Sequence, residues 1–248
     1  MSISVEAQTR MLLEPEAIGL LAAHDVPYVQ HRVANSADEA VDAAGQLGFP
    51  VVLKVVSPDV VHKTEVGGVI TGLSDESAVR AAFGSLVASL TAHIPGARFD
   101  GALVCRQVDA QRELIIGATI DATFGRTVMV GLGGVFAEAL ADVAFRVVPV
   151  RHEDGLSMLR ELRGLAVLTA HRGDGPVDLD AVAGLVVKVG DLVYSCPEIT
   201  EIDLNPVVWS HGECLALDAR IMVTGSAYGE STHHSDAPTS GSAGVAMR

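Results

Sequence analysis

The chain contains 248 residues, of which 49% are hydrophobic and 19% are charged, and its formal net charge is −14. A chain of this length can bury a large core in one or two domains, and its acidity argues against nucleic acid or an anionic membrane as a partner. Three scattered cysteines, no membrane span and no signal peptide predict a soluble cytoplasmic protein with reduced thiols.

The first hundred residues alternate helices and short strands. Ser36 to Glu39 has the form of a capping box that opens a helix, and Gly48 followed by Pro50 ends that helix. Ser74 is a candidate cap for the next helix. We therefore expect helices over Glu14–His24, 36–48 and 74–92, and strands over Tyr28–Val33, Val51–Val56 and Val69–Leu73.

The second half of the chain is richer in β-structure, and strands that cluster in pairs around isolated helices favour an α+β fold. Residues 225–248 contain almost no large apolar side chain, which predicts a disordered tail. The other expected elements are helices over Glu153–Leu162 and Leu179–Cys196, and strands over Ala102–Val108, Glu113–Asp121, Thr127–Gly131, Ile199–Val208 and Cys214–Ala219.

Two of the chain's three lysines, Lys54 and Lys63, lie on either side of one short loop. Lys54 interrupts an apolar strand, where a buried ammonium group needs an anionic partner such as phosphate. An edge-strand lysine that reaches solvent is the alternative. His62 precedes Lys63, and Gly67-Gly68 follows. This loop offers a nucleophilic imidazole, a cation and a flexible backbone, although an ordinary surface loop would look similar.

Two further segments could contact phosphate. Gly131, Gly133 and Gly134 follow a strand and precede an expected helical segment over Phe136–Leu140, so their N–H groups could hold an anion. The pattern is weak, because it is neither a dinucleotide fingerprint nor a P-loop. Arg146, which lies among apolar residues, is a second candidate for a buried cation.

Oxygen ligands gather near the end of the chain. Glu201, Asp203 and Asn205 alternate with apolar residues and therefore share one face of a strand. A hairpin would bring Asp218 close to them. An incomplete set of hard oxygen ligands suits a Mg²⁺ ion that keeps water and nucleotide phosphates in its shell, whereas the alternative is a solvated polar face.

These segments, in this order, resemble the ATP-grasp module of the NDP-forming acyl-CoA synthetases, above all the β subunits of ADP-forming acetyl-CoA synthetases and of the related succinyl-CoA synthetases. The resemblance covers about residues 12–224 and implies an ATP-grasp domain over residues 1–224, with two α+β lobes, about 12–100 and 101–224, clasping a nucleotide. It is carried by the strings 48–59, 62–69, 124–125, 131–136 and 201–206.

The resemblance also implies roles for individual residues. Lys54 would contact the nucleotide phosphates, and His62 would be a phosphohistidine on a mobile loop, with Lys63 and Arg146 assisting. The hinge beside the adenine would be Val104–Val108, including Gln107. The remaining implied roles are ribose binding by Glu113, nucleotide contacts by Gly133 and Gly134, and Mg²⁺ binding by Asn205 and Asp218 with support from Asp203.

The implied function is phosphoryl transfer between a phosphohistidine and ADP or ATP with Mg²⁺, during the reaction acyl-CoA + ADP + phosphate = acid + CoA + ATP. The CoA-binding α subunit would be a separate partner, in an α2β2 assembly. The alternative is a regulatory module that binds nucleotide without phosphoryl transfer and controls a partner acyltransferase or synthetase.

Overall fold

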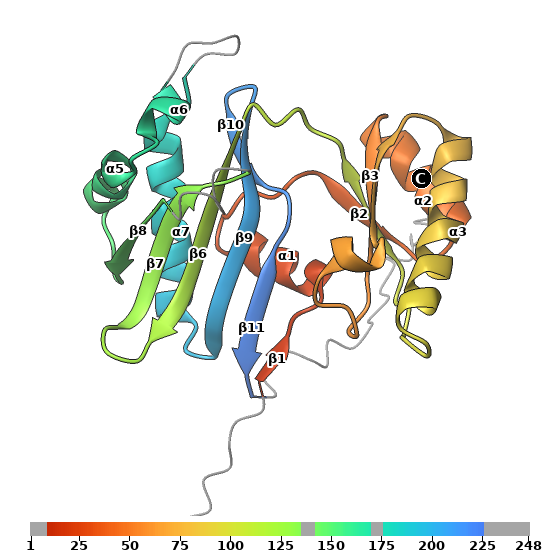
Figure 1. Ribbon diagram of the computed structural model, residues 1–248, viewed down its shortest axis with the longest axis horizontal. Helices are drawn as coiled ribbons and strands as arrows, with labels where there is room; N and C mark the ends of the chain where they lie inside the picture. The colour runs from red at the N-terminus through yellow and green to blue at the C-terminus, as the bar shows by residue number, and fades with distance from the viewer. Residues whose placement is uncertain (1–8, 135–141, 170–175, 226–248) are drawn as a thin grey trace, which may run out of the picture.

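The computed structural model describes residues 9–134, 142–169 and 176–225, and it contains two antiparallel sheets, each covered by helices (Figure 1). The larger sheet has the strand order β1-β11-β9-β6-β7-β8, with β10 paired to β9. The smaller sheet has the order β2-β5-β3-β4. The α+β class and the division into two layered lobes that we predicted from the sequence are confirmed.

The larger sheet is covered on one face by α5, α6 and α7, and an apolar stripe along α7 packs on β6, β7 and β9. Its strands are β1 (Thr9–Met11), β6 (Arg112–Asp121), β7 (Gly125–Leu132), β8 (Val143–Val147), β9 (Ile199–Ser210), β10 (Glu213–Ala216) and β11 (Arg220–Thr224). Its helices are α1 (Glu14–Ala23), α5 (His152–Glu161), α6 (Leu165–Thr169) and α7 (Leu179–Ser195).

The smaller sheet is covered on one face by α2 and α3. The Oγ of Ser36 accepts a hydrogen bond from the N–H of Glu39, as expected, but Asp75 rather than Ser74 caps α3, because its Oδ1 accepts from the N–H of Ala78. The elements are β2 (His31–Ala34), β3 (Val51–Val55), β4 (Val69–Leu73), β5 (Ala102–Arg106), α2 (Ala37–Leu47), α3 (Glu76–His93) and a 3₁₀ helix, η1 (Lys63–Val66).

Alternation along β3 decides which side chains leave the core of the smaller lobe. Val51, Leu53 and Val55 are buried against α2 and α3. Because successive side chains of a strand point to opposite faces, Val52 and Lys54 point to the other face of the sheet. That face meets the larger lobe.

The N-terminal elements correct the predicted lobe boundary at residue 12. β1 pairs with β11 of the larger sheet, and Leu12 and Leu21 lie in the larger core. Ile18 of α1 instead packs with Val56 and Leu103 of the smaller sheet. Residues 9–23 therefore belong with the larger lobe and contact the smaller one.

Two sequence predictions concern segments that the structure does not describe. The expected helical segment over 136–140 and the expected disordered tail, apart from Gly225, lie outside the described residues. Among the helices that are described, none is long and apolar enough to cross a membrane.

Candidate functional site

A cleft of about 860 Å³ lies between the two lobes. Pockets that hold small ligands commonly have about 300–1,000 Å³. The smaller lobe contributes Lys54 and the His62 loop to its lining, and the larger lobe contributes Asp203, Asn205 and Asp218. The cleft thus combines cations on one wall with oxygen ligands on the other.

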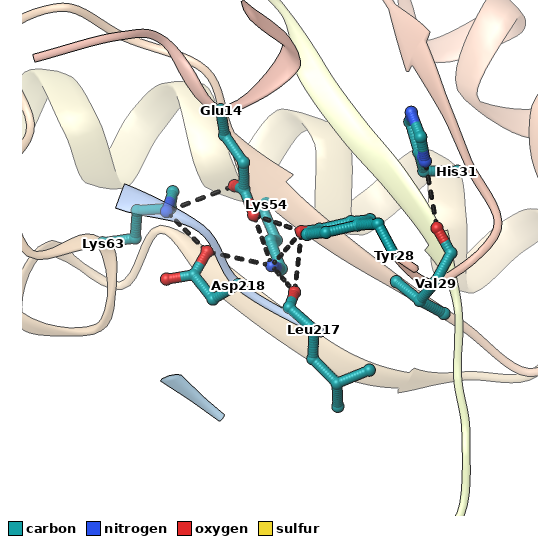
Figure 2. A network of polar contacts seen from close by, with 8 residues as sticks. All are labelled: Glu14, Tyr28, Val29, His31, Lys54, Lys63, Leu217 and Asp218. Carbon is teal, nitrogen blue, oxygen red and sulfur yellow. Dashed lines mark hydrogen bonds and ion pairs between the residues drawn. The ribbon is translucent and has the colours of Figure 1, made fainter. Parts of the chain in front are cut away.

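Lys54 is buried at the centre of a polar network (Figure 2). Its Nζ lies 2.7 Å from Oε1 of Glu14 and 3.1 Å from Oδ1 of Asp218, and it also donates to the carbonyl of Leu217. Burial acts to lower the pKa of Lys54, but the carboxylates of Glu14 and Asp218 outweigh it and raise that pKa above its usual value. Lys54 therefore stays positively charged, and it is not the solvent-reaching edge residue of the alternative.

Lys63 joins the same network from η1. Its Nζ lies 2.9 Å from Oδ1 of Asp218 and 3.2 Å from Oε2 of Glu14. Burial acts to raise the pKa of Asp218, but contact with Glu14 and the two lysines holds it below its usual range. Asp218 is consequently an ionised carboxylate shared by both ammonium groups.

Glu14 and Tyr28 are members of this network that the sequence analysis missed. The Tyr28 hydroxyl lies within hydrogen-bonding distance of Glu14 Oε1 and of the Leu217 carbonyl. Burial raises the pKa of Glu14, although Lys54 opposes this effect. A signal for Glu14 was present: it falls with Ala17, Ile18 and Leu21 on the apolar face of α1, where an unpaired acid would be costly. Tyr28, which lies outside the regular strands, has no such signal.

The oxygen ligands on the larger lobe lie along and beside the predicted hairpin. β9 pairs with β10, and the N–H of Leu217 donates to the carbonyl of Pro206, so Asp218 lies near Asn205. β10 ends at Ala216 rather than at Ala219 as expected, because the backbone turns there to present Leu217 and Asp218 to the lysines.

Asp203 lines the cleft beside a cation that we did not predict, Arg220. The Nη2 of Arg220 lies 2.6 Å from Oε1 of Glu201 and 3.9 Å from Oδ2 of Asp203. Burial raises the pKa of Asp203, partly offset by Arg220. Among the described residues, no group of three or more His, Cys, Asp or Glu side chains could hold a metal by itself. Asp203, Asn205 and Asp218 all line the cleft and offer oxygen atoms, the donor type that Mg²⁺ prefers, and their role as metal ligands stays a prediction.

His62 lies immediately before η1, lines the cleft and is exposed to solvent. The loop ends at Gly67, which has a φ of +64°, and at Gly68, where a Cβ would lie 2.5 Å from Cγ1 of Val55. Both glycines are therefore required by the local geometry of the loop that carries His62.

The predicted hinge residues lie on β5 and on the two residues that follow it, and their side chains point to opposite faces of the smaller sheet. Gln107 and Val108 line the cleft, and Oε1 of Gln107 accepts a hydrogen bond from the N–H of Gly72. Val104 is fully buried in the core under α2 and α3. Strand alternation turns the side chain of Val104 away from the cleft, and Cys105 lines the cleft instead. The role of Val104 in the hinge beside the adenine stays a prediction.

Glu113, Gly133 and Gly134 lie together, but they do not line the cleft that holds the lysines. The N–H of Gly133 donates to the carbonyl of Glu113, and a Cβ at Gly133 would lie 2.9 Å from that residue's carbonyl carbon. Close packing on β6 therefore explains Gly133 without an anion. Gly134 has a φ of +63°, which favours glycine. Their roles toward a nucleotide stay predictions.

Arg146 does not reach the cleft. It lies on β8, its side chain is 29% exposed, and its guanidinium pairs with Glu161 and contacts Ser157 of α5. The interpretation of Arg146 as a buried cation was wrong, because the apolar residues around it in the sequence form an exposed edge strand in which Phe145 and Val147 are each 51% exposed. Arg146 joins the edge strand to a surface helix.

Two lobes built on antiparallel sheets, with paired lysines facing oxygen ligands across a cleft, define an ATP-grasp protein. The sequence model of the ATP-grasp domain family matches residues 4–223, and the chain belongs to this family.

Within that class, one group of relatives is closely similar over almost the whole chain. The β subunit of acetate–CoA ligase [ADP-forming] I from Pyrococcus furiosus is 40% identical over 218 residues, which are 88% of this chain and 94% of that subunit. The chain therefore belongs to the family of ADP-forming acetate–CoA ligase β subunits.

Two solved structures from Ca. Korarchaeum cryptofilum support the same assignment, and both are of dinucleotide-forming acetyl-coenzyme A synthetase 1. One is a complex with coenzyme A, Ca-AMPCP and HgCl⁺; its TM-score is 0.84 and its identity 42%, covering 86% of this chain and 93% of that chain. The other, with coenzyme A and Mg-AMPPCP, has a TM-score of 0.75, 39% identity and the same coverage, and its phosphohistidine segment points towards the nucleotide-binding site.

Proposed function

We propose that this chain is the nucleotide-binding β subunit of an ADP-forming acyl-CoA synthetase and that it transfers a phosphoryl group between His62 and ADP or ATP. The observation that supports this proposal is the convergence of Lys54, Lys63, Asp218 and His62 on one cleft between the lobes. Two similar structures that hold nucleotide analogues, one with its phosphohistidine segment pointing towards the nucleotide-binding site, support a nucleotide as the ligand of this cleft.

The proposed step uses His62 as a nucleophile toward the γ-phosphorus of ATP. A lone pair of the imidazole forms an N–P bond while the P–O bond to the β-phosphate breaks, and ADP leaves; the reverse step forms ATP. A neutral imidazole is a competent acceptor near neutral pH. Lys54 and Lys63 would offset the negative charge of the transferring group.

Three oxygen donors, on Asp203, Asn205 and Asp218, would hold a Mg²⁺ ion at the larger-lobe wall of the cleft. When bound, such an ion stabilises charge on the phosphoryl oxygens. Of these donors, Asp218 is already ionised, because the lysines hold its pKa low. Asn205 is exposed and free to turn its carbonyl oxygen toward an ion.

The complete reaction also requires a site for CoA and the acyl group. We assign these to a separate CoA-binding α subunit in an α2β2 assembly, because the relative from Pyrococcus furiosus is named as a β subunit and this chain spans 94% of it. The nucleotide domain would extend over residues 1–224, with its two lobes meeting at the cleft.

A labelling experiment tests the role of His62. The chain is incubated with Mg²⁺ and γ-labelled ATP, and His62→Asn should reduce the incorporated label to background, because the asparagine amide cannot accept a phosphoryl group. His93→Asn is the matched control, since His93 is exposed near the end of α3 and should not affect labelling.

The result separates the synthetase from the regulatory alternative. Full labelling of the His62→Asn variant would falsify the phosphohistidine role. Tight binding of Mg·ADP by calorimetry without labelling of the unsubstituted chain, in the presence of its α subunit, would favour a regulatory module.

A further inference from the structure

In this structure the two cleft lysines are already bridged by an anion that belongs to the protein. A single oxygen, Oδ1 of Asp218, lies 2.9 Å from Nζ of Lys63 and 3.1 Å from Nζ of Lys54 (Figure 2). One carboxylate oxygen shared by two ammonium groups is the arrangement that a phosphate oxygen would adopt between them. The lysines therefore have an anionic partner that the protein itself supplies.

The two carboxylates that contact both lysines differ in their access to solvent. The side chain of Glu14 is 2% exposed and is also bonded to Tyr28. The side chain of Asp218 is 37% exposed and lines the cleft. Both carboxyl groups line the cleft, but the greater exposure of Asp218 makes it the one that an incoming ligand can displace more easily.

Two ammonium groups face two carboxyl groups in this cluster, so a free polyanion that enters the cleft has to compete with the protein's own acidic groups for the lysines. A ligand that brings its own cation meets a different site, because that cation can take over the carboxylate of Asp218 and leave both lysines free.

We propose that Asp218 occupies, in the free protein, the position on Lys54 and Lys63 that a phosphate of the nucleotide takes, and that Glu14 is the counter-ion that remains. This inference rests on the proposed function and specifies its substrate: the cleft selects a metal–diphosphate complex over a free diphosphate. Asp218 would then have two alternative partners, the lysines in the empty cleft and the metal in the filled one.

The test measures the binding of inorganic pyrophosphate to the full chain by calorimetry, with a chelator present to remove metal. Asp218→Asn and Asp218→Ala should bind metal-free pyrophosphate at least about tenfold more tightly than the unsubstituted chain, because the competing charge-assisted bonds are weakened or lost. A role for Asp218 limited to metal binding predicts no gain.

Glu65→Gln is the charge-matched control. Glu65 also lines the cleft and is exposed, so this change removes one negative charge without touching the lysine pairs. Its affinity for metal-free pyrophosphate should change less than about threefold, as expected for a screened surface charge. The proposal is overturned if both Asp218 variants, shown to be folded by thermal unfolding, gain no more affinity than Glu65→Gln.

A second arm adds Mg²⁺. The unsubstituted chain should bind pyrophosphate more tightly with Mg²⁺ than without it, and both Asp218 variants should lose most of that difference. An equal Mg²⁺ effect in all three proteins would contradict the exchange of partners. If the unsubstituted chain instead fails to bind Mg·ADP at all, the proposed function fails, independently of the metal-free comparison.

Discussion

Lys54 and Lys63 contact the same carboxylates but are held by the protein in different ways. Lys54 projects from a central strand of the smaller sheet, and its side chain is 9% exposed. Lys63 is 17% exposed and begins η1, immediately after His62. Lys54 is therefore fixed by the sheet, whereas Lys63 belongs to the loop that would have to move if His62 exchanges a phosphoryl group with a second site.

The three cysteines should differ sharply in reactivity. Burial raises the pKa of Cys105 and of Cys214 to about 12, and both side chains are buried, whereas Cys196 is partly exposed. A raised pKa keeps a thiol protonated, so at pH 8 only a minute fraction of these two is the reactive thiolate. Alkylation of the native chain at pH 8, followed by peptide mass spectrometry, should modify Cys196 first.

Cys196→Ser is the control for this experiment, and in its folded state this variant should take up almost no reagent. In denaturant the two remaining thiols should both react. Rapid modification of Cys105 in the native chain would contradict the burial of its side chain in the wall of the cleft.

At this scale the sequence predicts residues whose chemistry conflicts with their surroundings. Lys54 is recognisable because an ammonium group interrupts an apolar strand, and Asp203 and Asn205 because they alternate with apolar neighbours. The sequence could not show that the side chain of Val104 faces the core, because adjacent strand residues face opposite sides and an apolar run does not reveal which side is the cleft. Arg220 pairs across β9 and β11, and no local pattern predicts such a contact.

The His62 loop is an element whose C-terminal end is fixed by Gly67 and Gly68. Gly67 adopts a left-handed conformation, and a Cβ there would lie 2.6 Å from Oγ of Ser89, which itself bonds the carbonyl of Val66. Gly67→Ala should therefore lower the free energy of unfolding by about 1 kcal/mol or more. Urea unfolding followed by circular dichroism measures the change.

Gly45→Ala provides the matched comparison. Gly45 lies inside α2, and a Cβ there meets nothing within 4 Å. Alanine has the higher helix propensity, so this substitution should raise the free energy of unfolding by about 0.5–1 kcal/mol. Equal effects at the two positions would show that the geometry of the His62 loop is not strict.

Helices and strands were predicted well where caps and periodicity agree, as in α2 and α7. The wrong boundaries of β2 and β10 have a common cause: tertiary contacts determine where each of these strands begins or ends. β2 begins at His31 rather than Tyr28, because Tyr28 leaves the strand to bond Leu217, and β10 stops at Ala216 because the next residues turn toward the lysines. The glycines at 133 and 134 suggested an anion cradle, but packing against Glu113 accounts for Gly133.

The residues proposed to bind the nucleotide are divided between the two lobes, so one bound nucleotide would contact both lobes. Lys54 belongs to the smaller sheet and Asp218 to a loop of the larger one. A ligand that binds only the folded chain stabilises it by about 2.7 kcal/mol at a hundred times its Kd. ADP with Mg²⁺ should therefore raise the midpoint of thermal unfolding, measured by scanning calorimetry.

ADP with excess chelator is the control for this measurement and should give a much smaller shift, because the lysines remain bridged by Asp218. The absence of any shift with saturating Mg·ADP would argue that the cleft does not bind the nucleotide in the free subunit.

The family motifs predicted the overall architecture, whereas the lobe boundary could not be read from the order of residues. The described part of the chain starts on the larger sheet with β1, crosses to the smaller one after α1 and returns at β6. A boundary drawn by sequence position assigns α1 to the first lobe, because nothing local indicates that β1 pairs with a strand more than two hundred residues away. The pairing of β1 with β11 closes a loop of more than two hundred residues, and no local sequence pattern indicates it.

The pairing of β1 with β11 also bears on how this chain can be combined with others. Thr9 lies opposite Thr224 and Met11 opposite Met222, so the first and last described strands share one edge of the molecule (Figure 1). A second domain fused ahead of β1 would enter at nearly the same place as one fused behind β11. Gene fusions in either order would therefore join the described fold at the same edge of the larger sheet.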